Sequence, residues 1–95
     1  MRVTNVKLKN LEGQGRLKAV GSVCLDEELV IHGIRVVEGQ KGLFVSMPNR
    51  KGADGKYYSY VFLLDEGLRE QITKDVLDVY WHGYEGVEQE VVLYE

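Results

Sequence analysis

Several kinds of residue and segment are scarce in this 95-residue sequence, and each scarcity excludes a class of protein. Cys24 is the one cysteine, so an intramolecular disulfide framework is excluded. No apolar run is long enough to cross a bilayer as a helix, and segment 1–10 has no apolar stretch of the kind that secretory signals carry. We therefore expect a cytoplasmic protein with no membrane association. We expect one domain over residues 1–83 and a tail over 84–95.

Residues that build metal centres and active sites are also few. A zinc site needs about four ligands at suitable spacing, whereas Cys24, His32 and His82 stand alone in the sequence. Cys24 and His32 fall within apolar strand patterns, which indicates a small buried thiol and a core histidine. The chain also lacks the Gly-Lys-Ser/Thr ending of a phosphate-binding loop. We predict no metal, no cofactor and no enzymatic activity.

Basic residues nearly disappear from the second part of the chain. Segment 1–56 holds ten basic and six acidic residues, and segment 57–95 holds two basic and nine acidic ones, for a net charge of −3. The tail, Tyr84–Glu95, has four acids and no base. The acidic balance argues against indiscriminate binding to polyanions, while the asymmetry leaves room for a local basic surface. From charge alone, solvated strand faces are the simpler interpretation.

Alternation of apolar and polar residues predicts that the first two thirds of the chain form strands. We expect five strands, at Arg2–Leu11, Arg16–Leu25, Leu29–Val37, Leu43–Met47 and Tyr57–Leu63. The third and fourth contain apolar residues at successive positions. This pattern is typical of strands that are covered on both faces.

After Asp65 the apolar period changes to that of an amphipathic helix, with Leu68, Ile72, Val76 and Val79 on one stripe. Asp65 suits the N-cap, and we expect the helix to end near His82–Gly83. The predicted fold class is therefore α+β, a five-stranded antiparallel sheet followed by a C-terminal amphipathic helix. One helix covers one face of such a sheet, so we expect a second copy of the chain to cover the other face.

One polar loop combines basic residues with neighbouring aromatic ones. Arg50, Lys51 and Lys56 lead into an aromatic run of Tyr57, Tyr58, Tyr60 and Phe62. Cations that hold phosphate beside aromatic faces that stack on bases are typical of single-strand binding. Burial in the core is the simpler interpretation for Tyr60 and Phe62. If the first two strands pair, a possible secondary basic surface would gather Lys7, Lys9, Arg16 and Lys18.

Segments Val30–Gly39 and Gly42–Pro48, with Asp54-Gly55 further on, resemble the SpoVG family of bacterial septation and sporulation regulators. The likeness extends over about residues 1–82, and it implies a small α+β domain that dimerises and binds DNA and RNA. By position, Arg50 and Lys51 match a basic pair of the family, and Arg69 matches an arginine at the start of its helix. The chain departs from the family pattern at Ser59–Leu63 and at Asp65–Gly67. The second departure places two acidic residues at the start of the predicted helix, near Arg69.

The sequence thus predicts a homodimeric DNA- and RNA-binding regulator of gene expression and of septation or sporulation. Its phosphate contacts would come from Arg50, Lys51, Lys56 and Arg69. The alternative is a protein-interaction module that acts through the acidic tail, with no nucleic-acid role. Trp81 and Tyr84 favour this alternative, because aromatic residues often anchor interfaces.

Overall fold

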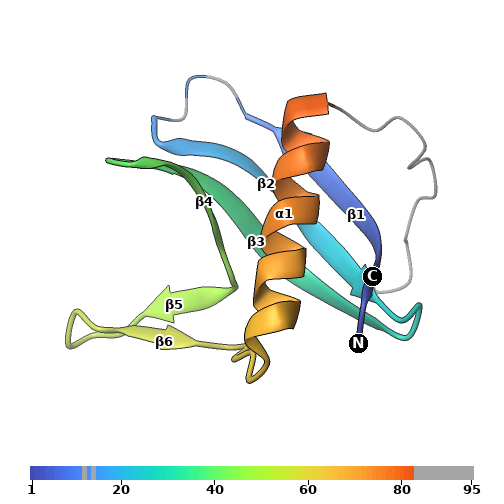
Figure 1. Ribbon diagram of the computed structural model, residues 1–95. Helices are drawn as coiled ribbons and strands as arrows, with labels where there is room; N and C mark the ends of the chain where they lie inside the picture. Colours follow the sequence, from blue (N-terminus) through green and yellow to red (C-terminus); the bar gives the residue numbers. More distant parts are fainter. Residues whose placement is uncertain (12, 14, 83–95) are drawn as a thin grey trace.

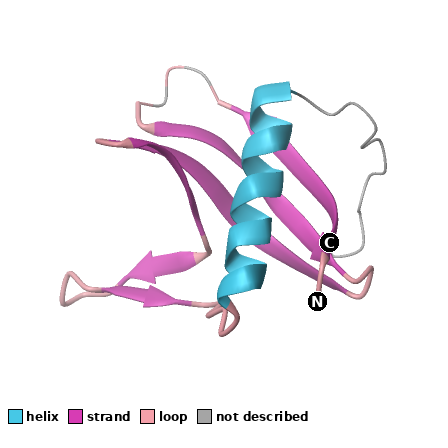
Figure 2. Cartoon of the chain, viewed as in Figure 1, coloured by secondary structure: helices cyan, strands magenta, loops and turns pink. Residues whose placement is uncertain are grey.

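The computed structural model describes residues 1–11, 13 and 15–82. The elements in order are β1 (Val3–Asn10), β2 (Leu17–Leu25), β3 (Leu29–Gly39), β4 (Gly42–Ser46), β5 (Asn49–Lys51), β6 (Tyr57–Ser59) and α1 (Glu66–His82). The first four strands form one antiparallel sheet in sequence order, and β5 pairs with β6 in a second, two-stranded sheet. Helix α1 lies across one face of the larger sheet (Figure 1). Figure 2 shows the same arrangement coloured by secondary structure, with the helix in cyan and the strands in magenta. The α+β class and the C-terminal helix are confirmed.

The core lies between the larger sheet and α1. Ile72 and Val76 of the helix are fully buried, one turn apart on the stripe that the sequence predicts. They pack against the buried apolar side chains of three strands, Val6, Leu8, Ala19, Val23, Leu25, Ile31, Ile34 and Val36. The predicted N-cap is also present, since the Oδ1 atom of Asp65 accepts a hydrogen bond of 2.9 Å from the backbone N–H of Gly67.

A β-bulge in β3 corrects the predicted pattern of that strand. Gly21 and Ser22 of β2 pair with Ile34 and His32, so Gly33 is skipped, and Gly33 has a φ of +86°. The bulge shifts the alternation by one residue, and Ile31 and Ile34 consequently share the buried face. Unbroken alternation along the predicted third strand would have placed these two residues on opposite faces. The prediction that His32 is a core residue is wrong, because His32 is exposed.

This bulge also removes an argument for a dimer. Apolar residues that seemed to lie on both faces of β3 lie largely on the buried face, because the bulge shifts the alternation of side chains by one residue. The helix-free face is therefore less apolar than the sequence suggested. A second copy of the chain therefore stays a prediction that must rest on another surface.

The predicted fifth strand of the sheet is wrong. Only Tyr57–Ser59 of that segment is a strand, and it pairs with β5 rather than with the larger sheet. Pro48 follows β4 and has no N–H to continue a ladder, which is consistent with the end of the sheet at this point. The carbonyl of Pro48 instead accepts a hydrogen bond of 3.0 Å from the N–H of Tyr60. The β5–β6 hairpin consequently projects from the body of the domain (Figure 1).

The remaining sequence predictions concern the acidic tail, membrane-spanning helices and metal ligands. The acidic tail, Tyr84–Glu95, lies outside the described residues. Within the described ranges, no helix is long and apolar enough to span a membrane, and no three His, Cys, Asp or Glu residues gather as metal ligands.

Candidate nucleic-acid interface

The loop of the β5–β6 hairpin is held by a short set of local hydrogen bonds. The N–H of Gly52 donates to the carbonyl of Lys56 at 2.7 Å, and the N–H of Gly55 donates to the carbonyl of Gly52 at 3.0 Å. Gly55 has a φ of +86°, a left-handed conformation that glycine adopts in turns without steric strain. The side chain of Asp54 accepts the N–H of Lys56 at 3.0 Å and the hydroxyl of Tyr58. These hydrogen bonds hold the loop in one conformation. The projecting hairpin carries three cations, Arg50, Lys51 and Lys56.

The cations of the hairpin lie beside aromatic rings. Arg50 pairs in register with Tyr58, and Lys51 pairs with Tyr57. The guanidinium carbon of Arg50 lies 5.2 Å from the centroid of the Tyr58 ring, which is a cation–π arrangement. Arg50, Lys51 and Lys56 are all exposed, so the structure brings three of the four predicted primary site residues together on an open surface.

The bond between Asp54 and Tyr58 perturbs both groups. The Tyr58 hydroxyl, and next the Lys56 N–H, hold the pKa of the Asp54 carboxyl below its ordinary value. The same bond to Asp54, aided by slight desolvation, raises the pKa of the Tyr58 hydroxyl above its ordinary value. Asp54 is thus ionised at neutral pH, and its carboxylate accepts hydrogen bonds from within the hairpin.

Arg35 anchors the hairpin, a role that the sequence did not predict. Its Nη2 atom donates a hydrogen bond of 3.0 Å to Oδ1 of Asn49, the first residue of β5. The Nδ2 atom of Asn49 donates to the carbonyl of Met47 at 3.0 Å. One signal was available in the sequence, because Arg35 is the one arginine or lysine within a mostly apolar strand. Its partner was not, because the contact joins two different sheets.

Arg69, the fourth primary residue, is engaged where the helix begins. Its Nη2 atom donates to the carbonyl of Leu63 at 3.4 Å, and its Nε atom lies 4.0 Å from a carboxylate oxygen of Glu66. These contacts give Arg69 a structural use at the start of α1. Its role towards phosphate stays a prediction.

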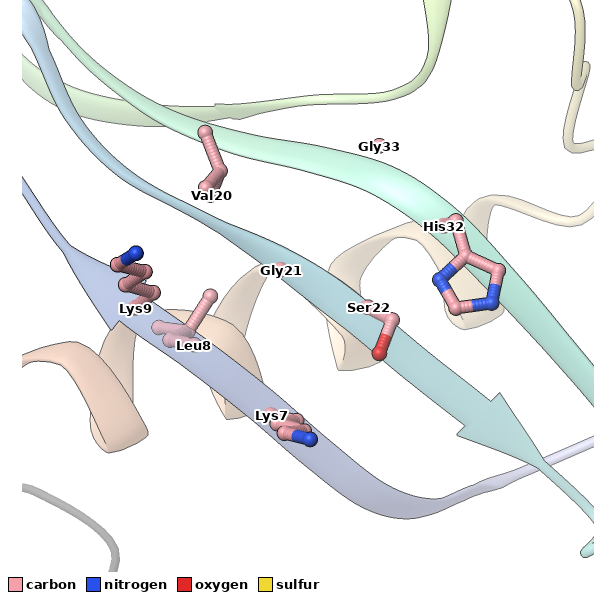
Figure 3. Close-up of a pocket in the computed structure, with 8 residues that line it drawn as sticks. All are labelled: Lys7, Leu8, Lys9, Val20, Gly21, Ser22, His32 and Gly33. Atoms are coloured by element: carbon pink, nitrogen blue, oxygen red, sulfur yellow. The ribbon is translucent and has the colours of Figure 1, made fainter. Parts of the chain in front are cut away.

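The possible secondary surface divides into two pairs. Arg16 donates from Nε to the carbonyl of Glu38 at 3.3 Å, and the Lys18 ammonium lies 3.4 Å from the Glu38 carboxylate. Lys7 and Lys9 instead border a hollow of about 450 Å³ on the helix-free face of the sheet, shown in Figure 3. The second pair is thus associated with a concave surface.

Charge is segregated between the two faces of the domain. Helix α1 carries Glu66, Glu70, Asp75 and Asp78 against two bases. One of these bases, Lys74, lies 3.1 Å from Asp78, which raises the pKa of the lysine. The lysines that border the hollow lie on the opposite side of the sheet from the helix (Figure 3). The asymmetry along the sequence thus becomes an acidic helix face and a basic sheet face and hairpin.

Comparison with known proteins gives this arrangement a family. The family model SpoVG matches residues 1–82. The chain belongs to the SpoVG family. The match ends at the last residue of α1, so it covers the whole region that the structure describes.

Individual relatives agree with this assignment. The SpoVG-family chain is 40% identical over 80 residues to "Putative septation protein SpoVG" of Agathobacter rectalis, which covers 84% of this chain and 92% of that protein. It is 41% identical over 80 residues to the protein of the same name from Clostridium perfringens strain SM101, over 84% and 89% of the two chains. It is 42% identical to "Putative septation protein SpoVG 2" of Listeria monocytogenes serotype 4b, over 84% and 78%.

The two segments that carry the resemblance to the family are neighbours in the structure. Val30–Gly39 and Gly42–Pro48 are the two sides of the β3–β4 hairpin and its exit. They contain the bulge at Gly33 and the proline that ends the sheet. A Cβ at Gly33 would lie 3.2 Å from Cβ of Pro48, so these two residues pack closely where the β5–β6 hairpin departs.

Proposed function

We propose that this SpoVG-family chain is a homodimeric regulator that binds single-stranded DNA or RNA and takes part in septation or sporulation. The names of its relatives support the process. The observation that carries the binding activity is the β5–β6 hairpin, which presents Arg50, Lys51 and Lys56 together with exposed aromatic rings. No enzymatic step is part of this proposal.

The exposure of the aromatic residues is the feature that distinguishes this surface from an ordinary polar loop. Tyr57 is 69% exposed, Tyr60 is 67% exposed and Phe62 is 73% exposed. The expectation that Tyr60 and Phe62 belong to the core is therefore wrong. Rings that stack on bases contribute about 1–3 kcal/mol per base, and they do so for any sequence. Cations beside such rings provide phosphate contacts that depend on salt.

The segment after β6 supports the dimer. Phe62 and Leu64, which is 90% exposed, have no polar group to offer to water. Exposed apolar patches on small domains mark interaction surfaces. We assign Phe62 and Leu64 to the contact with a second copy, and we assign Tyr57 and Tyr60 to base stacking. Replacement of Leu64 by serine should shift the chain from dimer to monomer in sedimentation equilibrium, and a wild-type monomer would contradict this assignment.

The binding activity can be tested by fluorescence anisotropy at about 50 and 200 mM salt, with random single-stranded DNA, single-stranded RNA and duplex DNA. We expect the double variant Arg50→Gln/Lys51→Gln to bind single strands more weakly. The slope of log K against log salt should fall by about 0.7 for each lost phosphate contact, or about 1.4 in total.

A matched control separates a contact from a general effect of charge. The variant Lys41→Gln/Lys74→Gln removes two positive charges from the β3–β4 turn and from α1, away from the hairpin. It should retain the slope of the unmodified chain. Equal losses in both double variants would show that the hairpin makes no specific contact, and no loss in the first would remove the hairpin from the interface.

A protein-interaction module is the second candidate function. Trp81, at the last turn of α1, is 66% exposed, and its ring packs edge-on against Tyr80 with centroids 5.3 Å apart. An exposed tryptophan is a favourable interface anchor. A folded dimer that binds none of the three nucleic acids at about 50 mM salt would favour this function.

A further inference from the structure

A hollow on the helix-free face of the larger sheet is lined by residues of β1, β2 and β3. We call it the sheet hollow, and the residues that line it are Lys7, Leu8, Lys9, Val20, Gly21, Ser22, His32 and Gly33. A Cβ at Gly21 would collide with the carbonyl oxygen of Lys7 and with the side chain of Leu8. Gly33 is the residue skipped by the bulge. A Cβ at Gly33 would lie 3.2 Å from Cβ of Pro48, so both glycines mark places where neighbouring atoms approach the backbone closely.

The side chains around the sheet hollow differ in chemistry from one side to the other. Lys7 and Lys9 come from β1, Ser22 comes from the middle strand β2, and His32 comes from β3 (Figure 3). Val20 adds apolar surface, whereas the side chain of Leu8 is buried in the core. Among the lining residues that the structure describes there is no carboxylate. The hollow therefore offers two cations on one edge and an imidazole on the other, with Ser22 between them and Val20 as an apolar contact.

We propose that the sheet hollow binds one nucleoside monophosphate unit. Its phosphate would lie at Lys7 and Lys9, and its base would lie against His32 and Val20. The volume of about 450 Å³ falls within the range of about 300–1,000 Å³ that is typical of small-ligand sites. Lysine is a usual phosphate ligand, and histidine is one of the rings on which unpaired bases stack.

Two sources could supply this unit, a free nucleotide or one nucleotide of a single strand. The strand source is favoured by the position of the hollow beside the root of the β5–β6 hairpin. Gly33, which lines the hollow, packs close to Pro48, and Arg35, two residues along β3, binds Asn49 of β5 at 3.0 Å. A strand that leaves the hollow along β3 would meet Arg50 next. In this form the inference rests on the proposed nucleic-acid function.

Nuclear magnetic resonance can locate the ligand on the folded chain. We expect adenosine 5′-monophosphate to shift the backbone amide signals of Ser22, His32 and Gly33 in a saturable way. Adenosine and inorganic phosphate, each of which carries half of the recognised chemistry, should bind more weakly. The variant Lys7→Gln/Lys9→Gln should weaken the monophosphate by about tenfold or more, which is the effect of losing about one charge-assisted hydrogen bond. The control Lys41→Gln/Lys74→Gln should leave its affinity unchanged.

His32→Ala gives a second test that needs neither lysine. It should reduce the affinity for the monophosphate while leaving that for inorganic phosphate unchanged, because only the base would contact the ring. A well-dispersed spectrum would show that each variant is folded. Amide shifts confined to α1 or to the hairpin would overturn the proposal, and so would equal losses in the Lys7/Lys9 variant and its control.

A ten-residue oligonucleotide separates the sources and separates this inference from the proposed function. Competition between the oligonucleotide and the monophosphate for the same amide signals would identify the strand source. Monophosphate binding by a chain that binds no oligonucleotide would retain the hollow and reject the proposed function. An oligonucleotide that binds through the hairpin while the monophosphate leaves Ser22, His32 and Gly33 unmoved would overturn the hollow and retain the proposed function.

Discussion

Arg35 of β3 and Asn49 of β5 belong to different sheets, and a hydrogen bond of 3.0 Å joins their side chains. The bond fixes the start of the projecting hairpin against the larger sheet. It joins the strand that borders the sheet hollow to the strand that carries Arg50. This single contact therefore relates the two surfaces on which the functional proposals rest.

The first prediction concerns this anchor. Arg35→Ala should lower the free energy of unfolding by about 1–3 kcal/mol, because the bond is partly buried and charge-assisted. Hydrogen exchange at the amide of Gly52 inside the hairpin should accelerate more than exchange at Val23 in the core. Arg35→Lys retains the charge but not the planar donor, and it should behave like the alanine variant. A lysine variant with unchanged exchange would show that charge alone holds the hairpin.

The second prediction concerns pH. The pKa of Asp54 is lowered from 3.8, so its contribution to hairpin order is complete above pH 3.8 and is lost as pH falls through the lowered pKa. The pKa of Tyr58 is raised from 10.0, so its contribution is complete below pH 10.0 and is lost as pH rises through the raised pKa. The amide signal of Lys56 should report both transitions.

Removal of the hydroxyl tests the cause of these shifts. In Tyr58→Phe the pKa of Asp54 should move back towards 3.8, because the largest cause of its depression is gone. The ring would still lie under Arg50, so salt-dependent binding to single strands should change little. An unchanged midpoint for Asp54 in this variant would show that the Lys56 N–H, rather than Tyr58, sets the pKa.

The third prediction concerns the turn between β2 and β3. Asp26 and Glu27 have φ values of 54° and 57°, a left-handed conformation that costs most residues about 1–2 kcal/mol. Glu27→Gly should therefore raise the free energy of unfolding by about 0.5–1 kcal/mol, and its N–H would still donate to Oγ1 of Thr4. Thermal unfolding should show a rise in Tm of a few degrees.

The neighbouring Glu28 serves as the control for this turn, since its φ is not positive. Glu28→Gly should give no stabilisation, because no strain is relieved and the unfolded chain gains freedom. Equal gains in both variants would show that backbone strain at Glu27 is not the cause.

The fourth prediction concerns the docking of α1. Ile72 is 1% exposed, so Ile72→Val should cost about 0.5–1.5 kcal/mol and Ile72→Ala about 2–5 kcal/mol in urea denaturation. Leu64→Ala should cost under about 0.5 kcal/mol in the monomer, since that side chain lies in water. A large cost at Leu64 in the monomer would show that this residue belongs to the fold rather than to a contact surface.

The sequence predicted those elements whose causes are local. The helix followed from Asp65 as N-cap and from the spacing of Ile72 and Val76, and these features act within one or two turns. The strands of the larger sheet followed from alternation. The bulge at Gly33 could not be derived in this way, because it depends on the pairing with β2, and one skipped residue reversed the expected faces of β3.

The candidate site divides in the same manner. The exposure of Arg50, Lys51 and Lys56 was predictable, since a charged loop beside a turn lies on the surface. The anchor at Arg35 and the sheet hollow were not, because each depends on residues far apart in the chain. Tyr60 and Phe62 were assigned to the core on their size and strand pattern. The short length of β6 reverses that assignment, because the segment leaves the sheet before either residue could be covered.

The separation of an acidic helix from a basic sheet face gives the domain an electric dipole moment across its thickness. In the field of a polyanion such a dipole experiences a torque, which turns the basic face forward before contact. Charges that touch no ligand would then raise the rate of productive encounter, and salt would lower that rate by screening the field. The acids of α1 would act at a distance, by making the wrong orientation repulsive.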